Sequence, residues 1–218
     1  MNKFDISRKL AFWCGILMLF SFSAIAEGGK DDTKLTKNIT KSYAMTSKSE
    51  VDIINKYGKV VVSAWDKDSV KIVVDIIAFG KNDDAVDKLM SKVNIDFMRS
   101  GDYLSVETKM NRKGGSFGAV LSNIEGYSKS LLNKNKVTID YTVYLPVTSS
   151  LNLENKFGDV FIGNFDGNID LDLSHGDLKA RSLKGDSKIL LSFGKGRIKY
   201  MKEGFLKLKG GEIEIDEG

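Results

Sequence analysis

Hydrophobic and polar residues alternate along most of the chain with a period of two. Apolar Val51 and Ile53, and then Val60 and Val62, are each separated by a single residue, and polar Lys59 and Ser63 flank the second pair. The alternation returns over 137–145, which ends at the single proline of the chain. This period is typical of strands with one buried and one solvated face. The sequence therefore predicts an all-β protein.

One short helix interrupts the strands. Asn82 can cap a helix over 83–93, two aspartates favour its first turn, and its apolar residues fall on one face. The apolar run 70–79 is more continuous and predicts a strand buried on both faces. Further strands are expected over 94–98, 103–110 and 137–145, and a long loop rich in Gly, Ser, Asn and Lys over 111–136.

An internal repeat links two distant segments. Residues 51–60 (VDIINKYGKV) return one hundred positions later as residues 151–160 (LNLENKFGDV). The chain therefore starts the same architectural unit twice.

Glycines recur at a fixed interval in the C-terminal part of the chain. They lie nine apart from Gly158 to Gly194, and the residues between them alternate in polarity. Each unit is expected to be a short strand entered through a glycine with a positive φ. The residue before the glycine is aromatic at alternate turns (Phe157, His175, Phe193), so the true repeat is eighteen residues with two strands per coil. This pattern predicts a β-solenoid in which like strands stack.

The first 26 residues have the features of a secretory signal peptide. A basic start precedes the apolar stretch Leu10–Phe22, and Ala24-Ile25-Ala26 forms a small-residue cleavage site. We divide the remaining chain into a linker (27–36), a strand-rich region (37–146) and the solenoid repeats (147–218). The protein is expected to be exported by a bacterium to the periplasm, the outer-membrane surface or the medium.

Composition and charge narrow the class of partner. Cys14 lies in the signal peptide, so the mature chain has no disulfide, which suits a bacterial envelope. Removing that segment leaves 33 − 3 = 30 basic and 29 − 1 = 28 acidic residues, a net charge of +2. Nucleic acid and strong binding to anionic lipid are therefore not expected. The ligand is expected to be a surface protein or polysaccharide.

One segment matches the sequence motif that surrounds the catalytic serine of many hydrolases. Residues 114–118 match Gly-x-Ser-x-Gly around Ser116, and several aspartates and His175 follow. A nucleophile elbow needs a strand, a sharp turn and a helix, whereas this match lies in the expected loop. His175 also occupies the position of Phe157 and Phe193, which predicts an aromatic turn residue. We assign no catalytic residue.

The nine-residue interval is also found in calcium-binding solenoids. Acidic or amide residues follow four glycines, at Asp159, Asn168, Asp177 and Asp186. The calcium repeats place their glycines and aspartates differently, because here the fourth place is apolar. A mature chain with one His and no Cys lacks the usual zinc and iron ligands. No metal or cofactor is expected.

Two charged clusters remain as candidates. Asp166, Asp170 and Asp172 could serve a polysaccharide lyase or hydrolase, although alternating acids are typical of a solvated strand. Stacking places Lys179 and Arg181 beside Lys195–Lys199, with Glu212, Glu214 and Asp216 one coil further, and Asp170 beside Lys188. We interpret these as solvated faces, with binding of an anionic polymer by the basic residues as the alternative.

The repeated motifs resemble a known family. They are NKYGKVVV at 55–62, WDK at 65–67, NKFGDV at 155–160, SHGDL at 174–178 and SFG at 192–194. Together they resemble the exported bacterial putative-adhesin proteins related to the head GIN domain, over about residues 45–218. The resemblance implies a right-handed β-helix in the cell envelope, with no catalytic residues to carry over. Members typically continue through further coils, so the acidic residues 212–217 either protect an open edge or precede missing sequence.

We therefore expect an exported non-enzymatic β-solenoid with an adhesin, binding or structural role. A carbohydrate-active β-helix enzyme and an accessory component of envelope signalling are the alternatives.

Overall fold

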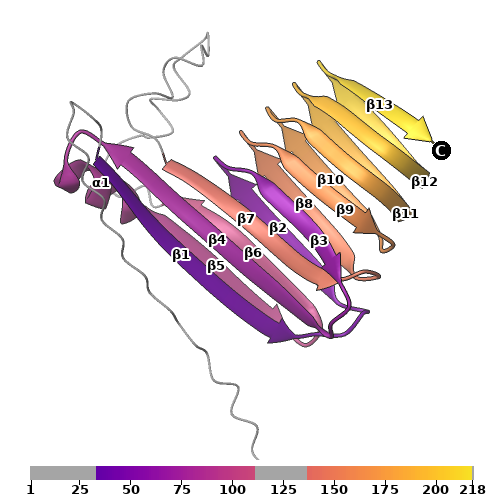
Figure 1. Cartoon of the computed structure of the whole chain (residues 1–218), viewed down its shortest axis with the longest axis horizontal. Helices are drawn as coiled ribbons and strands as arrows, with labels where there is room; N and C mark the ends of the chain where they lie inside the picture. Colours follow the sequence, from indigo (N-terminus) through magenta and orange to yellow (C-terminus); the bar gives the residue numbers. More distant parts are fainter. Residues whose placement is uncertain (1–32, 111–136, 218) are drawn as a thin grey trace, which may run out of the picture.

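The computed structural model describes residues 33–110 and 137–217, which form thirteen strands of one continuous sheet and one helix (Figure 1). The strands are β1 (Thr33–Ala44), β2 (Glu50–Lys56), β3 (Val60–Trp65), β4 (Ser69–Gly80), β5 (Val93–Ser100), β6 (Tyr103–Met110), β7 (Val137–Pro146), β8 (Ser150–Lys156), β9 (Val160–Phe165), β10 (Ile169–Ser174), β11 (Leu178–Ser192), β12 (Lys195–Lys209) and β13 (Glu212–Glu217); the helix is α1 (Asp83–Met90). The expected all-β fold with one short helix is confirmed. The predicted signal peptide and the 111–136 loop lie outside the described residues.

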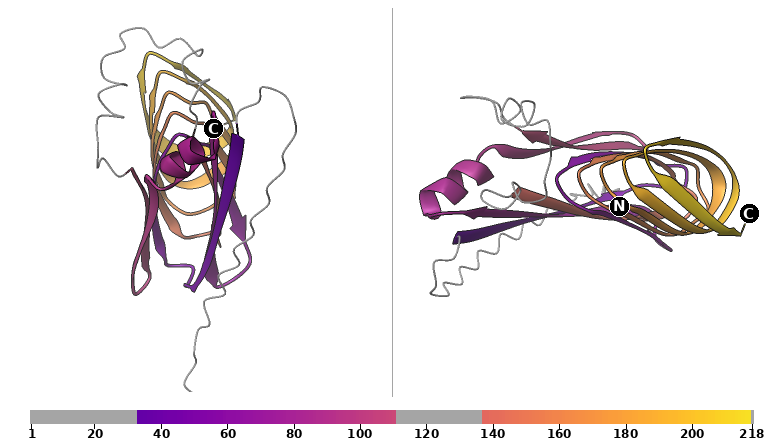
Figure 2. Two further views of the ribbon diagram at one scale, coloured as in Figure 1. Left: turned by 90° about the vertical axis from the view of Figure 1, so that its left-hand side faces the viewer. Right: turned by 90° about the horizontal axis from the view of Figure 1, so that it is seen from above.

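The sheet curls back on itself and encloses the core. Its order is β1-β4-β7-β3-β9-β11-β10-β8-β2-β6-β5, and β12 and β13 extend it beyond β11. The first half of β11 pairs with β9 and its second half with β10, so this strand passes from one side of the curl to the other. We call these sides the β3 face and the β2 face (Figure 2). Apolar side chains of both faces form one buried cluster between them.

Parallel strands stack with the predicted offset of eighteen residues. Ile169 of β10 lies opposite Leu151 of β8 and Ser187 of β11, and Leu178 lies opposite Val160 and Gly196. The stacking covers β8 to β13, and the offset shortens to seventeen where Ser187 lies opposite Gly204 in the second half of β11 and where Gly196 lies opposite Ile213 of β13. The hand of these coils stays a prediction.

The two copies of the internal repeat are neighbours in space. β2 pairs with β8 from Val51 opposite Leu151 onward, and β3 pairs with β9 at Val60 and Val160. All residues from 66 to 149 are therefore inserted between two consecutive coils. The insertion supplies β7 parallel to β3 and β6 parallel to β2. Beyond these strands the pairing is antiparallel, with β4 beside β7, β5 beside β6, and the preceding strand β1 beside β4. Regular coils thus do not extend through the whole sheet, and pairing crosses the predicted domain boundary at 146.

Three local expectations need correction. The helix ends at Met90 rather than at 93, because Ser91 caps it and Val93 starts β5. At its other end the predicted cap is confirmed, since Asn82 accepts a hydrogen bond from the Ala85 N–H at 3.0 Å. Strand β4 is not buried on both faces, since fully buried and half-buried residues alternate along it. The last residues of the predicted linker belong to β1, which begins at Thr33.

The glycines of the coil corners serve close packing, and their predicted positive φ is wrong. Positive φ belongs to the preceding residues Tyr57, Phe157, His175 and Phe193, at 68°, 62°, 57° and 56°. A Cβ on Gly158 would overlap the carbonyl oxygen of Gly58, and one on Gly176 would overlap that of Gly158. Gly194 meets Gly176 in the same way. Backbones of successive coils therefore touch at this corner, and only glycine leaves room for the contact.

We predict that Gly176→Ala lowers the free energy of unfolding by about 2–4 kcal/mol, because the added methyl forces two coils apart. Gly163→Ala is the matched control, since its Cβ would meet only the Val62 oxygen at 3.6 Å. Urea unfolding of both variants measures the difference. Equal losses in the two variants would show that the corner contact is not what requires glycine.

Candidate binding surface

A column of aromatic rings follows the glycine corner. Tyr57 stacks on Phe157 with centroids 5.6 Å apart, and His175 lies 5.0 Å from Phe157 and 5.1 Å from Phe193. The prediction that His175 is an aromatic turn residue is confirmed. Its ring faces contact phenyl rings, so the column offers ring edges rather than open faces to a ligand. Ser116, the other half of the apparent hydrolase motif, lies outside the described residues.

Behind this corner lies a buried polar network that sequence analysis missed. Asn55 Nδ2 donates to Asn155 Oδ1 at 3.1 Å, and Asn155 Nδ2 donates to the carbonyl oxygens of Gly58 and Gly158 at 3.1 and 2.8 Å. The Thr108 hydroxyl donates to Asn55 Oδ1 at 3.0 Å and lies 2.8 Å from the Tyr141 hydroxyl. The usable signal was an asparagine at the same inward position of both repeats.

Tyr141 is fully buried where this network meets the apolar core. Burial raises the pKa of its phenol well above the ordinary value of 10.0, and the hydrogen bond with Thr108 offsets only part of that shift. The neutral phenol is therefore the form that the folded protein requires. The network joins β2, β6, β7 and β8 and is structural, because it has no opening to a ligand among its members.

Acidic and amide residues that follow the corner glycines connect successive coils by hydrogen bonds. Asp159 Oδ1 accepts the backbone N–H of Asp177 at 2.9 Å, and Asp177 Oδ1 accepts that of Lys195 at 2.9 Å. Asn168 accepts the N–H of Asp186 in the same way at 3.1 Å. Within residues 33–110 and 137–217, no group of His, Cys, Asp and Glu is arranged to hold a metal ion.

Two of the three candidate catalytic carboxylates form ion pairs with lysines, and Asp172 lies two residues from Asp170 on the same outward side of β10. Asp170 lies 2.8 Å from Lys188 Nζ, and Asp166 lies 3.2 Å from Lys184 Nζ, each one coil further along. The expected placement of Asp170 beside Lys188 is confirmed. These contacts are solvent-exposed ion pairs between neighbouring strands, which contribute little individually. They are the pairing expected of a solvated face.

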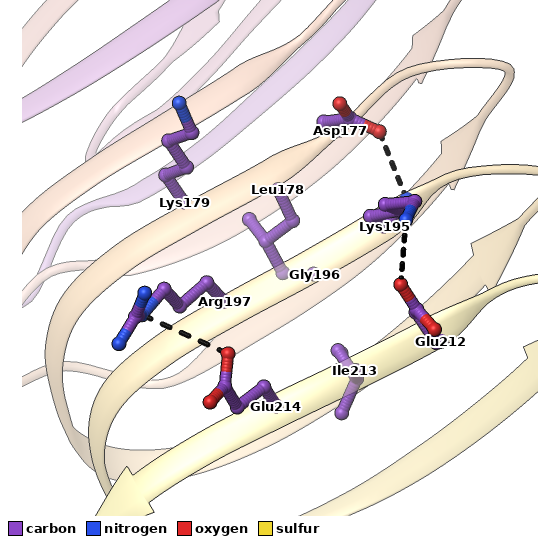
Figure 3. Close-up of a pocket in the computed structure, with 9 residues that line it drawn as sticks. All are labelled: Asp177, Leu178, Lys179, Lys195, Gly196, Arg197, Glu212, Ile213 and Glu214. Atoms are coloured by element: carbon purple, nitrogen blue, oxygen red, sulfur yellow. Dashed lines mark hydrogen bonds and ion pairs between the residues drawn. The ribbon is translucent and has the colours of Figure 1, made fainter.

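The β3 face carries a group of cations that we call the basic patch: Lys179, Arg181, Arg197 and Lys199. Lys179 lies opposite Arg197, and Arg181 and Lys199 lie between the registered pairs Ala180–Ile198 and Ser182–Tyr200. All four side chains are exposed. Arg197 lies 3.9 Å from Glu214 (Figure 3) and 3.4 Å from Asp216. The other three cations have no acidic partner within 4.0 Å in the described part of the chain.

A shallow groove of about 450 Å³ runs beside the basic patch across β11, β12 and β13. Leu178, Gly196 and Ile213 lie along its middle, with charged residues on either side (Figure 3). At one end Lys195 donates to Glu212 at 2.8 Å, and this hydrogen bond raises the pKa of Lys195. The surface therefore combines a cationic area with an acidic margin supplied by β13.

Comparison with known proteins identifies a shared fold. No family model and no curated protein matches the chain. The fold is similar to that of a putative cell adhesion protein from Clostridium sporogenes, with a TM-score of 0.59 and 11% identity over 84% of this chain and 100% of that one. A putative adhesin from Bacteroides fragilis matches at a TM-score of 0.20 and 15% identity, over 82% and 97% of the two chains. A putative lipid binding protein from Parabacteroides distasonis matches at 0.23 and 12%, over 83% and 95%.

The first similarity shows the fold alone, because the identity is so low, and the other two TM-scores are too low to support an argument. The relationship to the head GIN domain stays a prediction. In the part of the chain that the structure describes, no helix is long and apolar enough to cross a membrane.

We predict that the buried Tyr141 phenol makes stability fall with rising pH. Its pKa is higher in the folded than in the unfolded state, so its contribution is complete below about pH 10 and is lost as pH rises beyond that. For this one group, the free energy of unfolding can fall by at most about 1.4 kcal/mol per pH unit. Urea unfolding at pH 9, 10 and 11 should show a steeper decline in the free energy of unfolding for the natural protein than for Tyr141→Phe. The lysines titrate in both proteins, so the difference between them reports on the Tyr141 phenol. Parallel declines would contradict the assignment.

Proposed function

We propose that this protein is an exported, non-enzymatic attachment protein of the bacterial envelope, which binds an acidic surface polysaccharide through the basic patch. The observation that carries the proposal is the set of three exposed cations without acidic partners in the described chain, held at repeated positions of a rigid sheet. The predicted signal peptide supports export. The right-handed winding expected from the resemblance belongs to the same proposal.

The spacing of the patch suits an extended polyanion. Side chains on adjacent strands are about 4.8 Å apart, and alternate residues along one strand are about 7 Å apart. Four cations on this grid create a local positive potential, although the net charge of the mature chain is small. Flexible surface loops would spread the same charges and would lose more conformational entropy on binding.

Three of the residues considered for catalysis make structural contacts. His175 is stacked between phenyl rings, and Asp166 and Asp170 form ion pairs with lysines of the next coil. This favours binding over catalysis by a β-helix enzyme. The protein from Clostridium sporogenes that shares the fold is named for cell adhesion, which agrees with an attachment role.

We expect Lys179→Gln with Lys199→Gln to weaken binding to a soluble polyuronate roughly tenfold, because two cations without acidic partners are lost. The mature protein should bind polyuronate in preference to a neutral mannan, and binding should weaken as salt rises from 0.05 to 0.5 M. Microscale thermophoresis or calorimetry measures both dependences.

The matched control removes two exposed lysines elsewhere, Lys48→Gln with Lys81→Gln, and keeps the same net charge as the test variant. Equal weakening in test and control would reduce the effect to overall charge. Absence of polyuronate binding, or equal binding to mannan, would overturn the proposal. Glycan cleavage that Asp170→Asn abolishes would favour the enzyme alternative instead.

A further inference from the structure

The basic patch has different neighbours on its two sides. On one side is β13, where Glu214 and Asp216 lie close to Arg197. On the other side is β9, where Phe161 lies opposite Lys179. Neither β9 nor the next strand, β3, contains an acidic residue. A polyanion bound to the patch therefore meets carboxylates if it continues toward β13, and meets none on the first two strands toward β9.

A line of outward residues runs across the strands from the patch to β4. Tyr144 of β7 lies opposite Lys71 of β4 and also opposite Ser63 of β3. Continuing the register of β3 with β9 places Ser63 beside Gly163, and the registered pairs on either side place Gly163 beside Arg181 of β11. We call this line, with its last member on β12, the cross-strand row: Lys71, Tyr144, Ser63, Gly163, Arg181 and Lys199.

Cations lie at both ends of the cross-strand row, with hydrogen-bond donors between them. Lys71 and Arg181 are four strand spacings apart, which is about 19 Å along the sheet. The hydroxyls of Tyr144 and Ser63 have no hydrogen-bond partner among the described residues. A Cβ on Gly163 would meet only one backbone oxygen, at 3.6 Å, so packing does not require glycine there. The row thus offers positive charge and donors, which suit the carboxylates and hydroxyls of a uronic-acid chain.

Aromatic rings support the lysines along this path. Lys71 Nζ lies 5.7 Å from the Tyr144 ring centroid, and Lys179 Nζ lies 5.8 Å from that of Phe161. Tyr144 is itself stacked on Trp65, with centroids 5.2 Å apart. A ring attracts an ammonium group without neutralising its charge. These lysines are therefore positioned by their neighbours and still able to bind an anion.

The acids on the outward side of β4 and β7 have other partners. Asp75 accepts a hydrogen bond from an asparagine of β1 at 2.7 Å, and Asp140 lies 3.8 Å from Lys59 Nζ. The turn 66–68 contributes two aspartates, but it lies beyond the strand ends. Within residues 33–110 and 137–217, Lys71 has no acidic partner within 4.0 Å. Its charge is therefore as available as that of the basic patch.

We propose that the polysaccharide crosses the strands along this row, so that Lys71 and Tyr144 bind it together with the basic patch. The inference rests on the proposed function and adds the direction and the length of the ligand: a run of uronic acids that reaches from Arg181 to Lys71. A ligand lying along a strand would instead contact only two cations of the patch on each strand. Affinity is therefore expected to increase once an oligomer spans both ends of the row.

The test compares a trimer of galacturonic acid, which the basic patch alone can hold, with a dodecamer, which also reaches Lys71. Calorimetry on the mature protein measures both affinities. Lys71→Gln should weaken dodecamer binding roughly threefold, the loss expected for one exposed ion pair, and leave trimer binding unchanged. Lys34→Gln is the matched control, because Lys34 Nζ also lies over a ring, at 5.8 Å from the Phe79 centroid. Phe79 is about 27 Å along β4 from Lys71, so this variant should affect neither ligand.

A gain of affinity gives a second test that damage to the fold cannot imitate. Gly163→Lys adds a cation between the two ends of the row. It should bind the dodecamer roughly threefold more tightly than Gly163→Gln, whose side chain is similarly long but uncharged.

The outcomes separate this inference from the proposed function. No loss with Lys71→Gln, an equal loss with Lys34→Gln, an equal loss for the trimer, or no gain from Gly163→Lys would each overturn the inference. The proposed function would still stand if Lys179→Gln with Lys199→Gln weakened binding in the same experiments. If neither oligomer binds the natural protein, the proposed function and the inference are both overturned.

Discussion

The structure depends on backbone contact between successive coils at the glycine corner. Because the carbonyl oxygen of Gly158 occupies the place where Gly176 would carry a Cβ, the coils approach as closely as their backbones permit. The turn then requires a left-handed residue just before the glycine, and aromatic residues fill that position because stacking on the ring one coil away compensates for the unfavourable φ. The aspartate after the glycine accepts the next coil's N–H, so one short motif supplies contact, stacking and a hydrogen bond.

Because the repeated motif itself uses aromatic and acidic side chains, the residues that most resemble a reactive site have structural roles. The histidine in the aromatic column, the aspartates after glycines and the carboxylates opposite lysines all have partners one coil away, eighteen residues along the chain. The outward side of the strands is the surface left open to a ligand. There, cations of adjacent strands lie directly opposite one another, as Lys179 and Arg197 do. A repeat fold therefore presents charge as a grid rather than as a pocket, which suits recognition of a polymer.

Much of this arrangement could be predicted from the sequence because the repeat is local. The eighteen-residue offset and the alternation of inward and outward residues follow directly from spacing, as the pairing of Leu178 with Gly196 shows. The residue with positive φ could not be found in this way, since glycine is the usual choice and its real role depends on an atom in another coil. The Asn55–Asn155 hydrogen bond was likewise hidden, because residues 66–149 separate two strands that are neighbours in space.

The two ends of the described stack are built differently. At one end the faces approach through side chains of β1 and β5: Lys41 lies over the Phe97 ring, and Arg99 donates to the Ala44 carbonyl at 2.7 Å. Such contacts cover the core with groups that water also solvates well. At the β13 edge, Leu208 and Ile215 hold the same positions as buried residues of the preceding coil and lack an equivalent cover in the described chain.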